Sequence, residues 1–269
     1  MGVVIRAAVE QDRELVVRVL DEAFQDDPVS SWVFPGADYR RRTHHRLMAA
    51  FTDTVLAEGS IDLVEDGSAC ALWLSLPGGD AQGGDRDGGD RDGGTEPAGA
   101  GTGGAGTGRV ARGAVRADDD RQDDQQDGRD AEAAVEAVGG QQDGEPDGPA
   151  RMRDAVDPDN ERVELIGRLT EGIHPEGRAH AYLWMIGVAP GHQGEGLGGA
   201  LLAHRLEHCD RIGLPAYLEA SSARSRRLYE RLGFVDTGRP LDLPDGPRMW
   251  PMWREPRAHG QGAPSPVRA

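Results

Sequence analysis

The stretch GVAPGHQGEGLGGALL, residues 187–202, decides how this chain is interpreted. It joins an apolar segment to the predicted start of a helix, and six of its sixteen residues are glycine. At such a turn, exposed backbone N–H groups and the positive end of the helix dipole converge on one point, which suits an anion. The sequence therefore predicts a phosphate-binding loop.

Gly194, Gly196 and Gly199 also spell G-x-G-x-x-G, and Glu219 follows at roughly the spacing of about 20 residues seen in dinucleotide-binding domains. In those domains the first glycine closes the turn directly at the strand end, whereas residues 189–193 intervene here. Too little chain follows Glu219 for the remaining strands and helices of such a domain. These two features disfavour dinucleotide binding.

Two other interpretations of the loop are weaker. An NTPase phosphate loop needs Lys and then Ser or Thr after its last glycine, where this chain has Ala200 and Leu201. A surface turn without a ligand does not need so many glycines at the start of a helix.

The middle of the chain has a composition of its own. Residues 80–150 contain no Leu, Ile, Met, Phe, Tyr, Trp or Cys, and 18 of them are glycine. They hold 18 acidic residues against 7 arginines, so −11 of the net charge of −17 lies there. Such a segment cannot offset its ordering entropy by burial. We expect a disordered, acidic Gly/Asp-rich insert over 79–155 between domain parts 1–78 and 156–256, and a flexible tail at 257–269; a partner-binding acidic arm is the alternative.

The cellular context follows from what the sequence omits. Charges interrupt the N-terminal run where a signal peptide needs apolar residues, and about 18 consecutive apolar residues occur nowhere. Cys70 and Cys209 lie far apart among apolar neighbours, as reduced core thiols do. We expect a cytoplasmic protein with no membrane partner and no disulfide.

Apolar periodicity predicts alternating strands and helices. The first part is predicted as a strand at 3–8, a helix ended by Pro28, a helix over 37–58, and a hairpin of strands at 60–66 and 68–77. The second part is predicted as a helix from Asn160 whose apolar side face meets a sheet, a strand at 181–190, a helix with Leu202, Leu206 and Cys209 on one stripe, a strand at 215–220, a helix ended by Gly233, and two closing strands.

Gln193, Gly196 and Gly198 match the pattern of Arg or Gln, two residues, Gly, one residue, and Gly or Ala. This stretch resembles the signature of the GNAT superfamily of N-acetyltransferases, and the resemblance extends over nearly all of the chain predicted to be ordered. It implies an α/β fold with a central, mostly antiparallel mixed sheet of about six to seven strands flanked by helices. It also implies that acetyl-CoA is the cosubstrate and that the loop grips its pyrophosphate.

Within that superfamily, residues 217–234 and 245–256 resemble puromycin N-acetyltransferase and its actinobacterial relatives. The resemblance implies acetyl transfer to the primary amine of a small molecule, with an aminonucleoside antibiotic as one candidate. A protein or peptide N-acetyltransferase is the alternative enzyme. A non-catalytic acyl-CoA sensor with a partner-binding insert is the alternative outside catalysis.

The resemblance also assigns the cofactor-binding residues. Ile186, Gly187 and Val188 would lie along the pantetheine arm, with a backbone N–H near Val188 facing the thioester oxygen. The pyrophosphate loop would comprise Gln193, Gly194, Glu195, Gly196, Leu197, Gly198 and Gly199, with the side chain of Leu197 pointing inward. Ser225 stands where the family usually has an Asn that hydrogen-bonds the pantetheine arm.

Two residues are the catalytic candidates. Tyr229 occupies the family's position for a general acid that protonates the departing thiolate, although packing beside Leu228 and Leu232 is the alternative role. Glu219 is the candidate general base, acting through water; a structural carboxylate at a strand end is the alternative. Ser222 is expected to cap the helix that carries Tyr229.

Other polar features are expected to have no catalytic role. The basic run at 39–46 lies in a helix of an acidic protein, so no nucleic acid is expected as a partner. His204 and His208 lack an H-E-x-x-H glutamate and a third ligand, so no metal is expected. Asp26 and Asp27, just before Pro28, are expected to close the preceding helix, and the resemblance implies that the following loop borders the acceptor pocket, with a minor role in binding a cationic amine. The assembly is expected to be a monomer or a homodimer.

Overall fold

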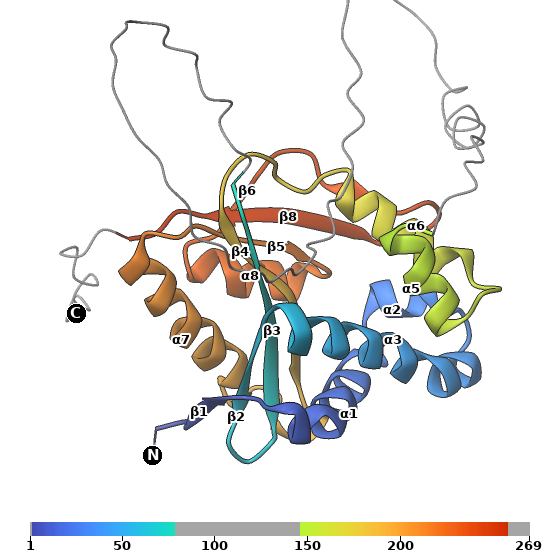
Figure 1. The fold of residues 1–269 in the computed structure, drawn as a ribbon, viewed down its shortest axis with the longest axis horizontal. Helices are drawn as coiled ribbons and strands as arrows, with labels where there is room; N and C mark the ends of the chain where they lie inside the picture. The colour runs from blue at the N-terminus through green and yellow to red at the C-terminus, as the bar shows by residue number, and fades with distance from the viewer. Residues whose placement is uncertain (1, 79–145, 258–269) are drawn as a thin grey trace, which may run out of the picture. The chain divides into compact units, whose positions relative to one another are not determined.

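The computed structural model describes residues 2–78 and 146–257, so the predicted tail from residue 258 and the insert up to residue 145 lie outside the described residues. The described residues form an eight-stranded sheet in the order β1-β2-β3-β4-β5-β8-β6, with β7 paired to β8 (Figure 1). The pairing of β4 with β5 is parallel and the other pairings of these strands are antiparallel. The mixed sheet is confirmed; it exceeds the expected size through the two-residue strands β6 and β7.

The first part of the chain supplies the expected three strands and two long helices, together with a short helix, α2, that the sequence did not predict. Its elements are β1 (Ile5–Ala7), the 3-10 turn η1 (Glu10–Asp12), α1 (Arg13–Phe24), α2 (Pro28–Val33), α3 (Ala37–Glu58), β2 (Ser60–Val64) and β3 (Ala69–Leu76).

The second part supplies the rest of the sheet and the helices that cover it. Its elements are α5 (Gly148–Val156), α6 (Glu161–Glu171), β4 (His180–Val188), the 3-10 turn η2 (Pro190–His192), α7 (Leu197–Ile212), β5 (Ala216–Ala220), α8 (Ala223–Arg231), β6 (Val235–Asp236), β7 (Leu241–Asp242) and β8 (Arg248–Arg254).

Pro28 begins a helix and does not end one. The first helix ends at Phe24, and Pro28 is the first residue of α2, where its missing N–H costs nothing and its fixed φ suits a helix. Asp27 is the N-cap, and its Oδ1 accepts hydrogen bonds from the backbone N–H groups of Val29 (2.8 Å) and Ser30 (3.2 Å). The prediction that Asp27 closes the preceding helix was therefore wrong.

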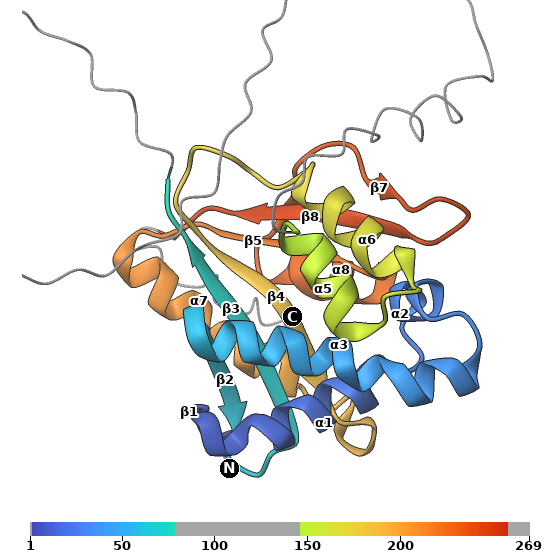
Figure 2. The ribbon, with the colours of Figure 1, turned by 45° about the vertical axis from the view of Figure 1, so that its right-hand side comes forward.

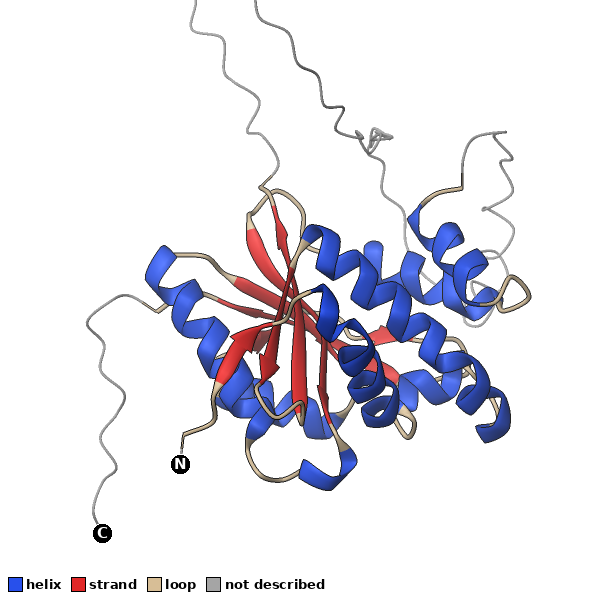
Figure 3. Cartoon of the chain, turned by 60° about the horizontal axis from the view of Figure 1, so that its bottom comes forward, coloured by secondary structure: helices blue, strands red, loops and turns tan. Residues whose placement is uncertain are grey.

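The sheet separates two apolar cores, which is why its central strands read as unbroken apolar runs. Cys70 and Leu72 of β3 pack toward α1, α2 and α3, whereas Ala71 and Trp73 pack toward α7 and α8. Figure 3 shows helices on both sides of the strands. The thiols of Cys70 and Cys209 are free and buried in opposite cores, which confirms reduced core cysteines.

The helix α5 falls within the range that the sequence assigns to the insert. Residues 148–156 form this helix, which packs against α6 and α3 (Figure 2). A side chain at Gly167 would place its Cβ 3.1 Å from the Cβ of Pro149, so the glycine permits the close approach of α5 to α6. The apolar face of α6 meets chiefly α5 and α2, whereas a sheet was expected.

Within the part of the chain that the structure describes, none of the helices combines the length and apolar character needed to cross a bilayer.

Candidate active site

The strands β4 and β5 separate soon after they pair. Their parallel register comprises Ala181 with Ala216 and Tyr182 with Tyr217. On its other edge β4 stays paired with β3 as far as Val188. The β5-facing edge of β4 beyond Tyr182 is therefore left without a strand partner in the described residues, and its backbone groups face an opening between the strands.

A β-bulge in β4 places two neighbouring side chains on the same side of the sheet. Leu72 pairs with Met185 and Trp73 pairs with Leu183, so Trp184 is the additional residue. As a result, Trp184 and Met185 both pack on the side of α1 and α3. The alternation then resumes, with Ile186 and Val188 on the side of α7 and α8.

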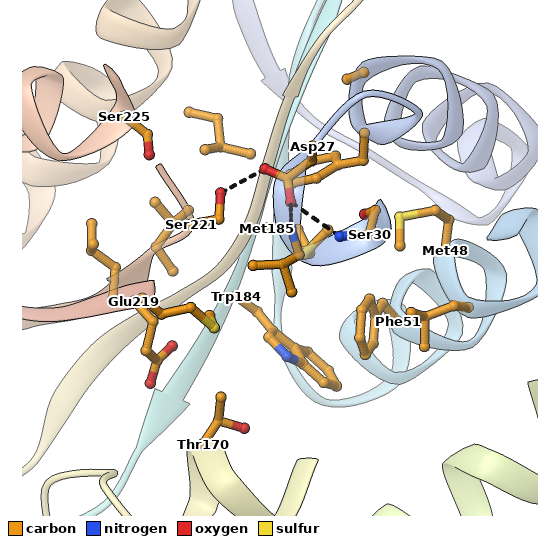
Figure 4. A pocket seen from close by; sticks show the side chains of 18 of the residues that line it. Asp27, Ser30, Met48, Phe51, Thr170, Trp184, Met185, Glu219, Ser221 and Ser225 are labelled. Carbon is orange, nitrogen blue, oxygen red and sulfur yellow. Dashed lines mark hydrogen bonds between the residues drawn. The ribbon is translucent and has the colours of Figure 1, made fainter. Parts of the chain in front are cut away.

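One cavity of about 1560 Å³ lies at this opening. It is bordered on one side by η2, the beginning of α7 and the helix α8. We call this region the α7/α8 end. On the other side it is bordered by α3, α6 and the loop over 172–176, which we call the α3/α6 end. Figure 4 shows the cavity with side chains from both ends.

The glycine loop presents backbone to the α7/α8 end. Gly194 (φ +91°) and Gly196 (φ +85°) lie in the left-handed region, where side chains are strained. Gly196 is the N-cap of α7, and among the residues that the structure describes no side chain caps this helix. The first-turn N–H groups of α7 therefore remain available to a ligand, at the positive end of a 16-residue helix.

The structure brings most of the predicted cofactor residues to this cavity. The lining members are Ile186, Val188, Gln193, Gly194, Gly196, Leu197, Gly198, Gly199 and Ser225. Leu197 is buried, as expected.

Two of the predicted residues do not line the cavity. Gly187 packs against α1, because an added Cβ would lie 3.0 Å from Cδ2 of Leu20. The exposed carboxylate of Glu195 faces His192 at 3.3 Å.

Ser225 has a structural partner as well as a place in the cavity wall. Its backbone N–H donates to Oγ of Ser222 (3.1 Å), and the N–H of Ser222 donates to Oγ of Ser225 (3.2 Å). This reciprocal pair is a capping box at the start of α8, which confirms the expected cap at Ser222.

The two ends of the cavity carry opposite charges. The lining residues of η2, α7 and α8 include basic side chains and no acidic ones. These basic residues are His192, Arg224 and Arg231. The lining residues of the α3/α6 end include three acidic side chains, and α5, which packs on α3 and α6, adds one arginine, Arg151. These acidic residues are Glu58, Glu171 and Glu176.

Tyr229 lies in the cavity wall on α8. It is 6% exposed and packs on Phe234, with ring centroids 6.0 Å apart. Burial, and secondarily the charge of Asp27, raise the pKa of its phenol above the ordinary value of 10.0. The phenol therefore keeps its proton near neutral pH, as a proton donor must.

A hydrogen bond joins the start of α2 to the end of β5. The Ser221 hydroxyl donates to Oδ2 of Asp27 at 2.7 Å, a contact visible in Figure 4. Burial raises the pKa of Asp27, while this bond and the helix N–H groups oppose the shift. Asp27 does line the cavity, but both of its carboxylate oxygens already accept hydrogen bonds from within the protein.

Glu219 is buried at the β5 wall, with a side chain that is 4% exposed. Its Oε2 accepts a hydrogen bond from the Tyr182 hydroxyl at 2.8 Å, whereas its Oε1 has no hydrogen-bond partner in the described residues. Burial raises the pKa of this carboxyl to about 7. It therefore exchanges its proton in the physiological range.

Two hydrogen-bonded histidines, His174 and His180, lie next to Glu219. Nδ1 of His180 lies 2.8 Å from the carbonyl oxygen of Arg178 and must donate to it. In the neutral ring its Nε2 then accepts from Nε2 of His174 at 3.0 Å. This leaves Nδ1 of His174 unprotonated, 3.9 Å from Oε1 of Glu219. Burial and the neighbouring His180 lower the pKa of His174 to about 4, so the pair is neutral at pH 7.

Sequence reasoning missed His174, Trp184 and Phe51, which all line the cavity. His174 sits in a loop and Phe51 on an ordinary helix, so neither carries a local signal. Trp184 lies in an apolar strand, where nothing in the sequence separates it from an ordinary core residue.

Comparison with known proteins agrees with this geometry. Residues 121–234 match the Acetyltransferase (GNAT) family. A mycothiol acetyltransferase of Streptomyces coelicolor is 40% identical over 75 residues, which cover 27% of this chain and 24% of the relative. The chain thus spans about a quarter of the length of the curated relatives it matches.

Two solved structures share the fold. One is a Corynebacterium glutamicum protein described as histone acetyltransferase HPA2 and related acetyltransferase, with a TM-score of 0.55 and 21% identity over 96% of this chain and 98% of that chain. The other is arylalkylamine N-acetyltransferase 2 from Aedes aegypti, with a TM-score of 0.52 and 13% identity over 96% of this chain and 100% of that chain. The chain therefore has the GNAT fold, and its residues 121–234 carry the sequence pattern of the GNAT acetyltransferase family.

Proposed function

We propose that the protein is an acetyl-CoA-dependent N-acetyltransferase acting on a primary amine. The observation that carries this proposal is the unpaired edge of β4, which leads directly into the uncapped N-terminus of α7. An extended amide chain can pair with such an edge, and a pyrophosphate can bind such a helix start. The two sites are continuous, as the parts of coenzyme A are.

In this proposal the backbone from Ile186 to Val188 holds the pantetheine arm. The N–H groups of the loop over 193–199 hold the pyrophosphate, and the positive φ values of Gly194 and Gly196 aim them. Arg224 and Arg231, at the same end of the cavity, supply positive charge to the phosphates.

The reaction would proceed by direct attack of the amine nitrogen on the thioester carbonyl carbon. As the tetrahedral intermediate collapses, the carbon–sulfur bond breaks and the leaving thiolate takes the phenolic proton of Tyr229. Glu219 would accept the ammonium proton before attack. Because its oxygens are buried, that proton must reach it through an intervening group such as water.

A small molecule is the proposed acceptor, and puromycin is the first candidate because of the resemblance of residues 217–234. The name of the Streptomyces relative adds mycothiol biosynthesis as a second source of acceptors.

The test is the release of free thiol when the purified full-length protein meets acetyl-CoA and a panel of amines that includes puromycin and a peptide with a free N-terminus. Acceptor-dependent thiol release, with the acetylated amine found by mass spectrometry, is the expected result. Tight binding of coenzyme A without acceptor-dependent release would favour a sensor, and exclusive turnover of the peptide would favour a peptide acetyltransferase.

A further inference from the structure

We propose that the acceptor amine is carried on an apolar body about the size of an aromatic ring, and that Phe51 and Trp184 select for it. This inference rests on the proposed function. It concerns the α3/α6 end of the cavity, where no part of the glycine loop takes part.

The selecting surface is a pair of aromatic rings. The centroids of Phe51 and Trp184 are 4.4 Å apart and their planes are inclined by 48°. Both side chains are partly exposed, and both line the cavity. Figure 4 shows them facing each other within it. Aromatic surface that water covers is stabilised when an apolar ligand covers it instead.

Methionine side chains extend this surface. Met185 is partly exposed and is placed beside Trp184 on one side of the sheet by the bulge, whereas Met48, one turn before Phe51 on α3, is 1% exposed and supports the surface from the core. Both line the cavity. Thioethers adapt to irregular apolar shapes and contact aromatic rings favourably, so the wall suits an aromatic body more than a rigidly defined polar one.

The hydroxyl groups of this end offer no free proton to a polar ligand. Thr54 donates to the carbonyl oxygen of Ala50 at 3.0 Å. Thr170 donates to the carbonyl oxygen of Ile166 at 2.9 Å. These two are the threonines among the lining residues of α3 and α6. The hydroxyl groups of a polyhydroxylated acceptor could donate to the carboxylates of this end, but their oxygens would find no free threonine proton. Their bonds to water would therefore be replaced only in part, which costs free energy.

The charged side chains of this end suit the amine group of the acceptor. The three acidic side chains of Glu58, Glu171 and Glu176 outnumber the single Arg151 of the neighbouring α5, so the net charge favours the approach of an ammonium group over a carboxylate. An aromatic amine without a carboxylate therefore satisfies both the charge and the apolar wall.

The test compares 2-phenylethylamine with ethanolamine and glucosamine as acceptors of the full-length protein at one pH. We expect kcat/KM to be at least about 100-fold higher for 2-phenylethylamine, since even one methylene in an apolar pocket is worth about 10-fold or more. In Phe51→Ala the ratio of kcat/KM between the aromatic and polar amines should fall by at least about tenfold. In Leu56→Ala, a truncation on the same helix outside the cavity wall, the ratio should not change.

Equal or better turnover of ethanolamine or glucosamine would overturn the inference and leave the proposed function standing. If no amine is acetylated, the proposed function fails, and binding to the protein saturated with coenzyme A decides the inference alone. Tighter calorimetric binding of 2-phenylethylamine than of ethanolamine, lost in Phe51→Ala and kept in Leu56→Ala, supports it. Equal affinities for the two amines overturn it.

Discussion

The α7/α8 end and the α3/α6 end of the cavity are built from different materials. The α7/α8 end presents backbone, with glycine at Gly194 and Gly196 and an uncapped helix start. The α3/α6 end presents side chains, with two aromatic rings and an acidic border. In the proposed function, backbone groups bind the pyrophosphate and the pantetheine arm, which are the same in every acetyl-CoA molecule. Side chains distinguish one acceptor amine from another. The predictions below test whether the two ends act separately.

The largest effect is expected at Tyr229, in the α8 wall of the cavity. In Tyr229→Phe we expect kcat to fall by about 100-fold or more, because a positioned general acid contributes about that much. The dissociation constant for coenzyme A should not change, because the phenol ring remains. Steady-state kinetics and calorimetry measure the two quantities. Tyr39→Phe, which removes a hydroxyl outside this cavity, is the control. Full turnover with an unchanged pH profile in Tyr229→Phe would exclude the general-acid role.

The second prediction concerns pH dependence at Glu219. Its folded-state pKa of about 7 exceeds the ordinary value of 4.5, so the folded state holds the proton that the unfolded state releases between these values. The contribution to stability is complete below about pH 4.5 and is lost as pH rises to about 7, a fall of about 3 kcal/mol. In Glu219→Gln this fall should be absent from the free energy of unfolding, measured in urea at pH 5 and pH 8.

The control for this measurement is Glu14→Gln on the exposed side of α1. Identical pH slopes for wild type and Glu219→Gln would contradict the raised pKa. In the same variant, a rate that recovers only at alkaline pH would support the role of the carboxylate as base, and an unchanged pH–rate profile would contradict it.

Gly196, the N-cap of α7, and Gly199, in the first turn of α7, form a matched pair of sites for substitution. An added Cβ meets nothing within 4 Å at either position, but only Gly196 has a positive φ. Gly196→Ala should therefore destabilise the fold by about 1–2 kcal/mol and weaken coenzyme A binding by about tenfold. Gly199→Ala lies in α7 and should stabilise the fold by up to about 1 kcal/mol. Urea titrations give both values; equal stabilities would show that φ does not explain the glycine.

The smallest effect is expected for the exposed arginines of α8. Arg224 lines the cavity and Arg227 does not. Arg224→Gln should raise the dissociation constant for coenzyme A by a factor of about three, since an exposed ion pair contributes less than about 1 kcal/mol. High salt should abolish the difference. Arg227→Gln should bind like wild type. Equal losses in the two variants would point to a general effect of charge.

The sequence predicts the α7/α8 end better than the α3/α6 end, and the reason is physical. Gly194, Gly196 and the start of α7 form a local unit, because a glycine turn and a helix start depend on neighbouring residues. The strands β3 and β4 are also readable, because burial on both faces leaves unbroken apolar runs.

The α3/α6 end depends on contacts between distant parts of the chain. Phe51 and Trp184 lie 133 positions apart and meet only in the folded structure. The helix α5 is only nine residues long, with Met152 and Val156 as its larger aliphatic side chains, and it is held by packing on α6 and α3, so the sequence beside the insert gives little local signal for it. The bulge at Trp184 leaves no mark in the alternation of an all-apolar strand.

If the proposed function holds, the single additional residue in β4 also bears on how the choice of acceptor can be altered. Side chains before and after it serve different compartments, so substitutions at Trp184, Met185 and the facing positions Met48 and Phe51 change one compartment while the strand edge keeps its pairing surface. A library of variants confined to these four positions would sample new acceptors at constant affinity for the acyl donor. Deleting the additional residue would instead turn the side chains beyond it to the opposite side of the sheet. Positions that face the acceptor and positions that face the acyl donor would then no longer be separate.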